Sequence, residues 1–309
     1  MIETGEENVV DHWLELMLSE NNIDVSGVLP STPRLEISMS FGTECQVDQR
    51  TWVIPPPQGD GCSSIDARDY WEQRHGALQY ENVYSVTEDP GFRAKVMTLL
   101  SGVIDPLRPS RILVPGCGAK GLLEQDLVAS FQATSVLATD YPGVARAAAA
   151  RLQHPCVGFA GKGSRHLGLR SEFDAAVVVN SVLSDSDHDN RAMLHSVHAA
   201  LRPTGVFIGL FPTIFAPVDI GFCEERERWR LELVDLPHSR YCFDEATAAT
   251  HILYTPLRLR TILREAGFTA LQMEIFFCES SCLRDEAFRV YGLEGRDVVL
   301  YELLVTSRK

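Results

Sequence analysis

A glycine-rich segment and one acidic residue are the parts of this sequence most able to do chemistry. Gly116, Gly118 and Gly121 follow a short apolar stretch, and glycine there lets the backbone turn sharply and a ligand approach closely. The start of the helix expected behind them offers free N–H groups and a positive dipole. Asp140 follows a second apolar stretch, where a carboxylate can accept both hydroxyls of a ribose. A tight strand–helix turn would explain the glycines alone, but the two features together predict a site for a nucleoside-type cofactor.

The elements that must position these residues are alternating strands and helices. We expect strands over 111–114, 135–139, 156–159, 173–180 and 206–211, helices over 122–131, 142–152 and 189–201, and a turn over 203–205. Short connections between such elements are typical of a doubly wound α/β domain with a mostly parallel sheet. Two more strands, 269–276 and 297–306, have no convincing helix between them. They predict an antiparallel pair that closes the edge of a seven-stranded sheet, with the last strand antiparallel.

The residues before the first strand divide into two parts. Residues 1–65 combine an amphipathic helix, extended pieces and a loop rich in Pro and Gly, and we interpret them as an appendage. Residues 66–107 are interpreted as a helical lid, in which Asp89 caps a helix that begins at Pro90. The apolar stripe from Val9 to Met17 could form a homodimer contact or pack on its own domain.

The charge balance limits the partners. The chain of 309 residues has 28 Lys and Arg against 42 Asp and Glu, a formal net charge of −14. That charge disfavours nucleic acid and anionic membrane surfaces and is compatible with a cationic or zwitterionic substrate. No stretch reaches the roughly 18 apolar residues of a membrane span, and the acidic start lacks a signal-peptide pattern. We therefore expect a cytoplasmic protein.

The polar segment from Asp185 to Asp189 invites a metal interpretation, because carboxylates and an imidazole suit a divalent ion. The preferred interpretation is a turn in which Asp189 caps the following helix. We expect no metal site.

Several motifs resemble those of one known family. Leu113–Gly118 (Leu-Val-Pro-Gly-Cys-Gly), followed by Ala138–Tyr141 (Ala-Thr-Asp-Tyr), resembles the first two strand ends of the class I S-adenosylmethionine-dependent methyltransferases. Phe173–Val179 is similar to the family's fourth strand, Leu201–Gly205 to its Leu-Arg-Pro-Gly-Gly turn, and Leu263–Phe268 to the end of its late helix. The resemblance implies a Rossmann-like methyltransferase domain over 108–309, with S-adenosylmethionine as cofactor and S-adenosylhomocysteine as product.

The resemblance also implies roles for individual residues. The segment Asp69–His75 resembles an aromatic lid helix of the family, and Val114 and Lys120 replace an acid and a glycine that many members carry. That replacement leaves open which group binds the methionyl amine. The implied cofactor-binding set is Gly116, Cys117 and Gly118 near the methionyl part, Asp140 at the ribose, Tyr141 and Gly161 around the adenine, Asn180 and Ser181 beneath the sulfonium, and Trp71 and Arg74 over the methionyl carboxylate.

Substrate groups in this family usually come from the segment after the fifth strand, which here is a long insert over 212–255. Methyl transfer needs a nucleophile that is held near the methyl group and loses its proton. His238 and Tyr241, in an expected loop, are the candidate base and positioning hydroxyl. The leading hypothesis is a methyltransferase acting on a small molecule, an amine or amino-acid derivative of natural product biosynthesis. The alternatives are O- or C-methylation, a protein lysine methyltransferase, and a non-catalytic cofactor-binding scaffold subunit.

Overall fold

The computed structural model describes Glu72 and residues 85–105, 108, 110–131, 134–223, 231–244, 249–278 and 300–309. The predicted appendage over 1–65, with its amphipathic helix and its dimer contact, lies outside these residues. Most of the predicted lid before residue 85 also lies outside them.

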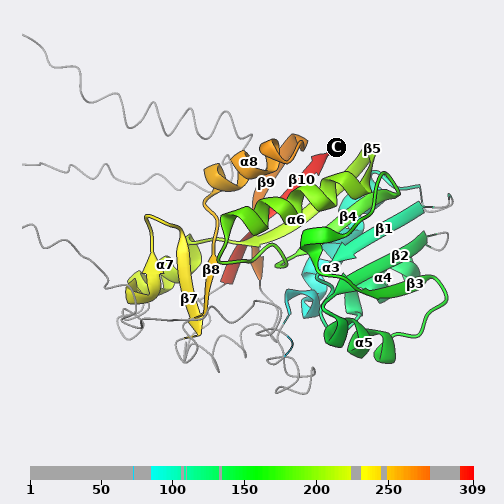
Figure 1. The fold of residues 1–309 in the computed structure, drawn as a ribbon, viewed down its shortest axis with the longest axis horizontal. Coiled ribbons are helices and arrows are strands. Elements are labelled where there is room, and N and C mark those ends of the chain that lie inside the picture. The colour runs from blue at the N-terminus through cyan, green and yellow to red at the C-terminus, as the bar shows by residue number, and fades with distance from the viewer. Residues whose placement is uncertain are drawn as a thin grey trace, which may run out of the picture. The chain divides into compact units, whose positions relative to one another are not determined.

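In the described residues, seven strands form one mixed sheet in the order β3-β2-β1-β4-β5-β10-β9 (Figure 1). The strands are β1 (Ser110–Pro115), β2 (Thr134–Asp140), β3 (Val157–Gly161), β4 (Phe173–Val179), β5 (Leu201–Pro212), β9 (Thr269–Cys278) and β10 (Leu300–Arg308). The first five are mutually parallel, and β10 runs antiparallel to both β5 and β9. The predicted α/β class with an antiparallel last strand is confirmed.

Helices cover both faces of the sheet because alternate strand residues point to opposite sides. The helical elements on the two faces are η1 (Val86–Glu88), α3 (Pro90–Ser101), α4 (Leu122–Ser130), α5 (Pro142–Arg151), η2 (Ser164–His166), α6 (Asp187–Ala200) and α8 (Pro256–Glu265). In β1, Ile112 and Val114 join a core with α3 and α4, whereas Leu113 joins a second core with α6 and α8 (Figure 1). Burial on both faces accounts for the continuous apolar run of β4. None of the helices in the part of the chain that the structure describes is long and apolar enough to span a bilayer.

Capping residues set where the helices begin. Asp89 accepts the Phe92 N–H at 3.0 Å, directly before Pro90, so the predicted start of α3 is confirmed. The prediction that Asp189 caps the next helix is wrong. Ser186 is the N-cap of α6, and its hydroxyl accepts the Asp189 N–H at 3.3 Å. Asp189 therefore lies in the first turn, where an acidic side chain interacts favourably with the helix dipole.

Two predicted strand boundaries also differ. β3 continues to Gly161 instead of ending at Phe159, because it stays paired with β2 as far as Asp140. The predicted turn over 203–205 lies inside β5. The pairing with β4 jumps from Phe173–Leu201 to Ala175–Val206, so the intervening residues form a bulge inside β5 instead of a turn that precedes the strand.

The predicted insert after β5 forms a small substructure of its own. It contains α7 (Phe215–Cys223) and a three-stranded antiparallel sheet of β6 (Val234–Asp235), β7 (Arg240–Asp244) and β8 (Ala249–Ile252) (Figure 1). Its core of Ile214, Val234 and Leu253 packs against Leu183, which follows the end of β4. The insert therefore lies at the carboxyl ends of β4 and β5.

Candidate functional site

The glycine turn after β1 has a backbone that favours glycine. Gly116, Gly118 and Gly121 have φ values of 68°, 67° and 67°, in the left-handed region. A Cβ on Gly116 would lie 2.1 Å from the Cβ of Ser181, whereas a Cβ on Gly118 would meet no atom within 4 Å. Gly116 thus allows the chain after β4 to pack closely, and Gly118 borders open space.

Asp140 is bound to this turn through the backbone. Its two carboxylate oxygens accept the N–H groups of Gly118 at 2.8 Å and Tyr141 at 2.7 Å. Burial, with a smaller contribution from the charge of Glu72, raises the pKa of Asp140 to about 6 against the lowering effect of these two N–H groups. Each oxygen keeps a second lone pair that can accept another hydrogen bond.

The predicted adenine-side residues lie next to Asp140. Gly161 is the β3 partner of Asp140, and a Cβ on it would lie 3.0 Å from Pro142. A Cβ on Gly163 would lie 3.7 Å from the ring of Tyr141. A surface hollow of about 270 Å³ is lined by Pro142, Ala145, Arg146, Ala149, Phe159 and Gly161. Tyr141 and Gly161 are therefore brought to the same end of the sheet as the glycine turn.

Asn180 and Ser181 directly follow β4, at the same end of the sheet. The Ser181 hydroxyl donates to the Pro115 carbonyl at 2.9 Å, which fixes it against the glycine turn. The Asn180 side chain donates through Nδ2 to Glu302 Oε1 at 2.7 Å. Sequence reasoning does not single out Glu302. The feature that could have identified it is a single glutamate within the apolar stretch of β10.

Two buried titratable residues belong to this region, Cys117 in the glycine turn and Glu124 in the first turn of α4. Burial raises the pKa of the Cys117 thiol well above its usual value, and the charges of Asp140 and Glu124 add to this effect. Any role of Cys117 at the cofactor is therefore a role of its backbone, since a buried thiol stays protonated. Both carboxylate oxygens of Glu124 are buried without a hydrogen-bond partner. Burial raises the pKa of Glu124 to about 7. Glu124 is a second acidic residue that the sequence analysis does not identify.

The described contacts of His238 and Tyr241, the two candidate catalytic residues, involve the insert and α8. His238 is exposed, and its Nδ1 lies 2.8 Å from Asp235 Oδ2. The expectation of a loop is wrong for Tyr241, which lies in β7 because it pairs with Val234 and His251. Its ring packs on the core of the insert. Trp71 and Arg74 lie outside the described residues.

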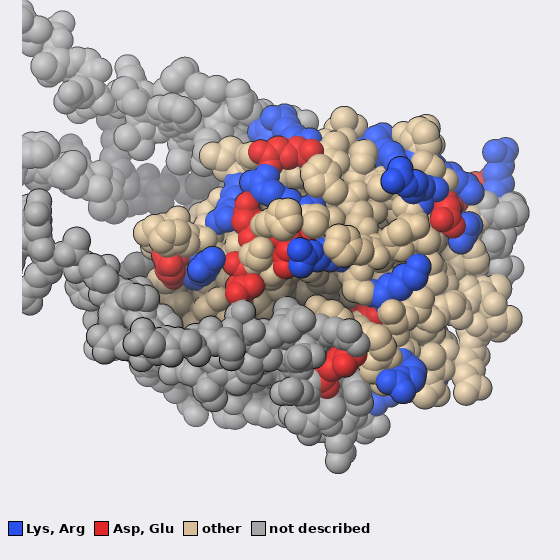
Figure 2. Space-filling model, in the orientation of Figure 1, with Lys and Arg blue, Asp and Glu red and all other residues tan. Residues whose placement is uncertain are grey.

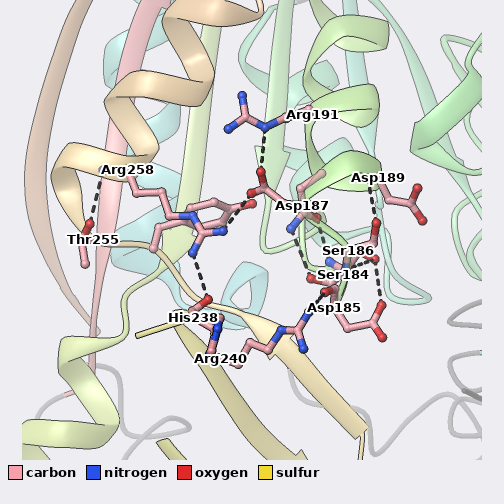
Figure 3. A network of polar contacts seen from close by, with 12 residues as sticks. Ser184, Asp185, Ser186, Asp187, Asp189, Arg191, His238, Arg240, Thr255 and Arg258 are labelled. Carbon is pink, nitrogen blue, oxygen red and sulfur yellow. Dashed lines mark hydrogen bonds and ion pairs between the residues drawn. The ribbon is translucent and has the colours of Figure 1, made fainter. Parts of the chain in front are cut away.

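A polar network joins the insert to α6 and α8 (Figure 3). Arg258 donates to the His238 carbonyl and to Asp187 Oδ1, both at 3.0 Å, and Arg191 donates to Asp187 Oδ2 at 2.7 Å. Arg240 donates to the Asp185 carbonyl at 3.1 Å. Burial alone would raise the pKa of Asp187, but the hydrogen bonds from Arg191 and Arg258 lower it. Asp187 is thus a structural anion.

The surroundings of this network are mixed in charge. Figure 2 shows acidic and basic side chains interspersed over the face that carries α6 and α8, in keeping with the ion pairs Arg191–Asp187 and Arg258–Asp187. Among the described residues, no group of three or more His, Cys, Asp or Glu side chains could hold a metal ion.

Comparisons with solved structures identify the fold. An S-adenosylmethionine-dependent methyltransferase from Methanosarcina mazei is 17% identical, with a TM-score of 0.51 over 68% of this chain and 96% of that one. The 1,6-didemethyltoxoflavin-N1-methyltransferase of Burkholderia thailandensis, solved with 1,6-didemethyltoxoflavin and S-adenosylhomocysteine, is 18% identical, with a TM-score of 0.49 over 78% and 85%. No protein-family model matches the sequence, and no curated protein does. The chain has the class I S-adenosylmethionine-dependent methyltransferase fold.

Proposed function

We propose that this chain is an S-adenosylmethionine-dependent methyltransferase that acts on a small molecule. One observation carries the proposal. The carboxylate at the end of β2, Asp140, accepts the N–H of Gly118, the glycine that borders open space. In doubly wound sheets, ligands bind beyond the carboxyl ends of the strands, and an acid at this position suits a ribose.

The residues present fit the cofactor. A side chain at Gly118 would fill space that is open, and the oxygens of Asp140 retain lone pairs for two hydroxyl donors. The methionyl part would pass along the backbone of Gly116 and Gly118, and the adenine would lie by Tyr141 and Gly161. The bound sulfonium would supply an electrophilic methyl group.

The chain's own residues would then position an acceptor and take its proton. Ser181 is fixed to Pro115, so the end of β4 stays next to the glycine turn. The insert over 212–255 packs on Leu183 at the same edge and is suited to enclose a small substrate. The net charge of −14 supports an amine or amino-acid derivative as acceptor. His238 and Tyr241 remain candidates for contact with it.

Calorimetry with S-adenosylmethionine and S-adenosylhomocysteine tests the proposal. The wild-type chain should bind both, and Asp140→Asn should weaken binding by about 100-fold, because charge-assisted hydrogen bonds of about 1.5–3 kcal/mol become neutral ones. Asp174→Asn is the matched control. Asp174 also accepts a backbone N–H, that of Arg111 at 2.8 Å. It lies near the start of β4, at the end of the strands opposite to the proposed cofactor site.

Two results would reject the assignment of the site: a folded wild-type chain that binds neither compound, or an unchanged affinity in Asp140→Asn. Binding without methyl release onto any of a panel of amines, alcohols and lysine-containing peptides would instead support the scaffold hypothesis. Transfer only to the peptides would support the protein-lysine hypothesis.

A further inference from the structure

Asn180 and Glu302 form a polar pair that spans β4, β5 and β10. The pair lies at the carboxyl ends of the parallel strands, where the proposed cofactor site also lies. Asn180 follows β4, and its N–H donates to the Leu210 carbonyl of β5 at 3.0 Å. Glu302 of β10 is the pairing partner of Pro212 in β5. Asn180 Nδ2 then donates to Glu302 Oε1 at 2.7 Å, across the end of β5. Since Ser181 packs on Gly116, the pair is one residue away from the glycine turn.

The pair is only half satisfied. Asn180 Oδ1 and Glu302 Oε2 are buried, and neither has a hydrogen-bond partner. A buried polar atom without a partner costs about 1–3 kcal/mol, and native structures contain few such atoms. Asn180 also has a φ of 46°, a strained conformation of the kind that gathers at functional sites. When Glu302 is ionised, both unpaired atoms are acceptors, so the missing partner of that form is a donor of two hydrogens.

The carboxyl group of Glu302 is suited to proton exchange near neutrality. Burial raises the pKa of Glu302 to about 7, against the lowering effect of the hydrogen bond from Asn180. Its strand neighbours, Pro212 and Phe276, do not titrate. On α7, Asp219 bonds to Tyr301, the preceding residue of β10, whose side chain points to the opposite face of the sheet.

We propose that Asn180 Oδ1 and Glu302 Oε2 bind the two N–H groups of a primary amine, and that Glu302 is the catalytic base of its N-methylation. A hydroxyl offers one hydrogen and would leave one acceptor unpaired, so the pair favours an amine. The neutral nitrogen forms the bond to the methyl carbon, and the carbon–sulfur bond breaks with its electron pair going to sulfur. The proton released from nitrogen passes to the ionised Glu302. This inference rests on the proposed function.

The test uses the full chain and matched probes, benzylamine against benzyl alcohol and butylamine against butanol. We expect wild type loaded with S-adenosylhomocysteine to bind the amines and not the alcohols, and to methylate the amines when S-adenosylmethionine is supplied. Glu302→Gln keeps an acceptor for Asn180 Nδ2, so it should retain cofactor affinity while amine turnover falls by about 100-fold or more. The rise of kcat/KM with pH through about 7 should also disappear.

Glu274→Gln on β9 is the control, since Glu274 is half-exposed and pairs with Lys95 at 2.8 Å. Glu302→Asp, which keeps a shorter carboxylate, should recover part of the turnover. Unchanged amine turnover in Glu302→Gln, methylation of alcohols in preference to amines, or no amine binding to the loaded wild type would each overturn the inference. Failure of the wild type to bind S-adenosylhomocysteine would instead refute the proposed function itself.

Discussion

Glu124 is a buried carboxyl group in the first turn of α4, and replacing it with glutamine should change how the stability of the protein depends on pH. Both of its oxygens are buried, no other described residue donates a hydrogen bond to them, and Glu124 is 1% exposed. Burial, with a smaller contribution from the charge of Asp140, raises its pKa from 4.5 to about 7 against the lowering effect of its own backbone N–H. The folded state therefore holds a proton that the unfolded chain releases as the pH rises between these values.

The linkage between proton binding and folding gives the direction and the size of this change in stability with pH. The contribution of Glu124 to the free energy of unfolding is fully present below about pH 4.5 and is lost as the pH rises through about 7. At about 1.4 kcal/mol per pKa unit, the full loss is about 3 kcal/mol, of which about 2–3 kcal/mol falls between pH 5 and pH 8. Glu124→Gln cannot titrate, so its stability relative to wild type should improve by that amount from pH 5 to pH 8.

Urea unfolding at a series of pH values measures this difference. Asp140 and Glu302, whose pKa values burial raises to about 6 and about 7, titrate in both proteins, so their contributions largely cancel. The matched control is Glu232→Gln, at an exposed glutamate. Its profile should run parallel to that of wild type. Parallel profiles for wild type and Glu124→Gln would refute the claim that burial dominates at this carboxyl group.

The remaining predictions concern the glycine turn and a helix cap. Gly116→Ala should destabilise the chain by more than about 3 kcal/mol, because the new Cβ would lie 2.1 Å from Ser181, whereas Gly118→Ala should lose only about 1–2 kcal/mol for its left-handed φ. Thermal unfolding would check the order of the two variants, and equal losses would contradict it. Ser186→Ala should lower the unfolding free energy by about 1 kcal/mol, because it removes the N-cap of α6. His195→Ala, at an exposed position inside the same helix, is the comparison, and an equal or larger loss there would contradict the cap assignment.

Local patterns in the sequence predict most of the fold. Continuous apolar runs mark β1, β2 and β4, because strands buried on both faces have no polar side to show. Gly118 and Asp140 are also visible locally, since Gly118 lies in the glycine turn after β1 and Asp140 lies at the end of β2. The boundary of α6 is missed because Asp187 and Asp189 look as suitable for capping as Ser186. The bulge in β5 is missed because Pro203 and Gly205 are typical of a turn, which placed the start of the strand after them.

The sequence by itself determined the alternation of strands and helices, the glycine turn and the acid beside it, because these depend on backbone sterics and burial within a few neighbouring residues. Only the tertiary structure decided that Glu302 meets Asn180, 122 residues earlier in the chain. The insertion of β10 between β5 and β9 creates that contact. Strand order is a property of the whole sheet, and no local pattern of hydrophobic residues encodes which distant strand will supply a polar partner.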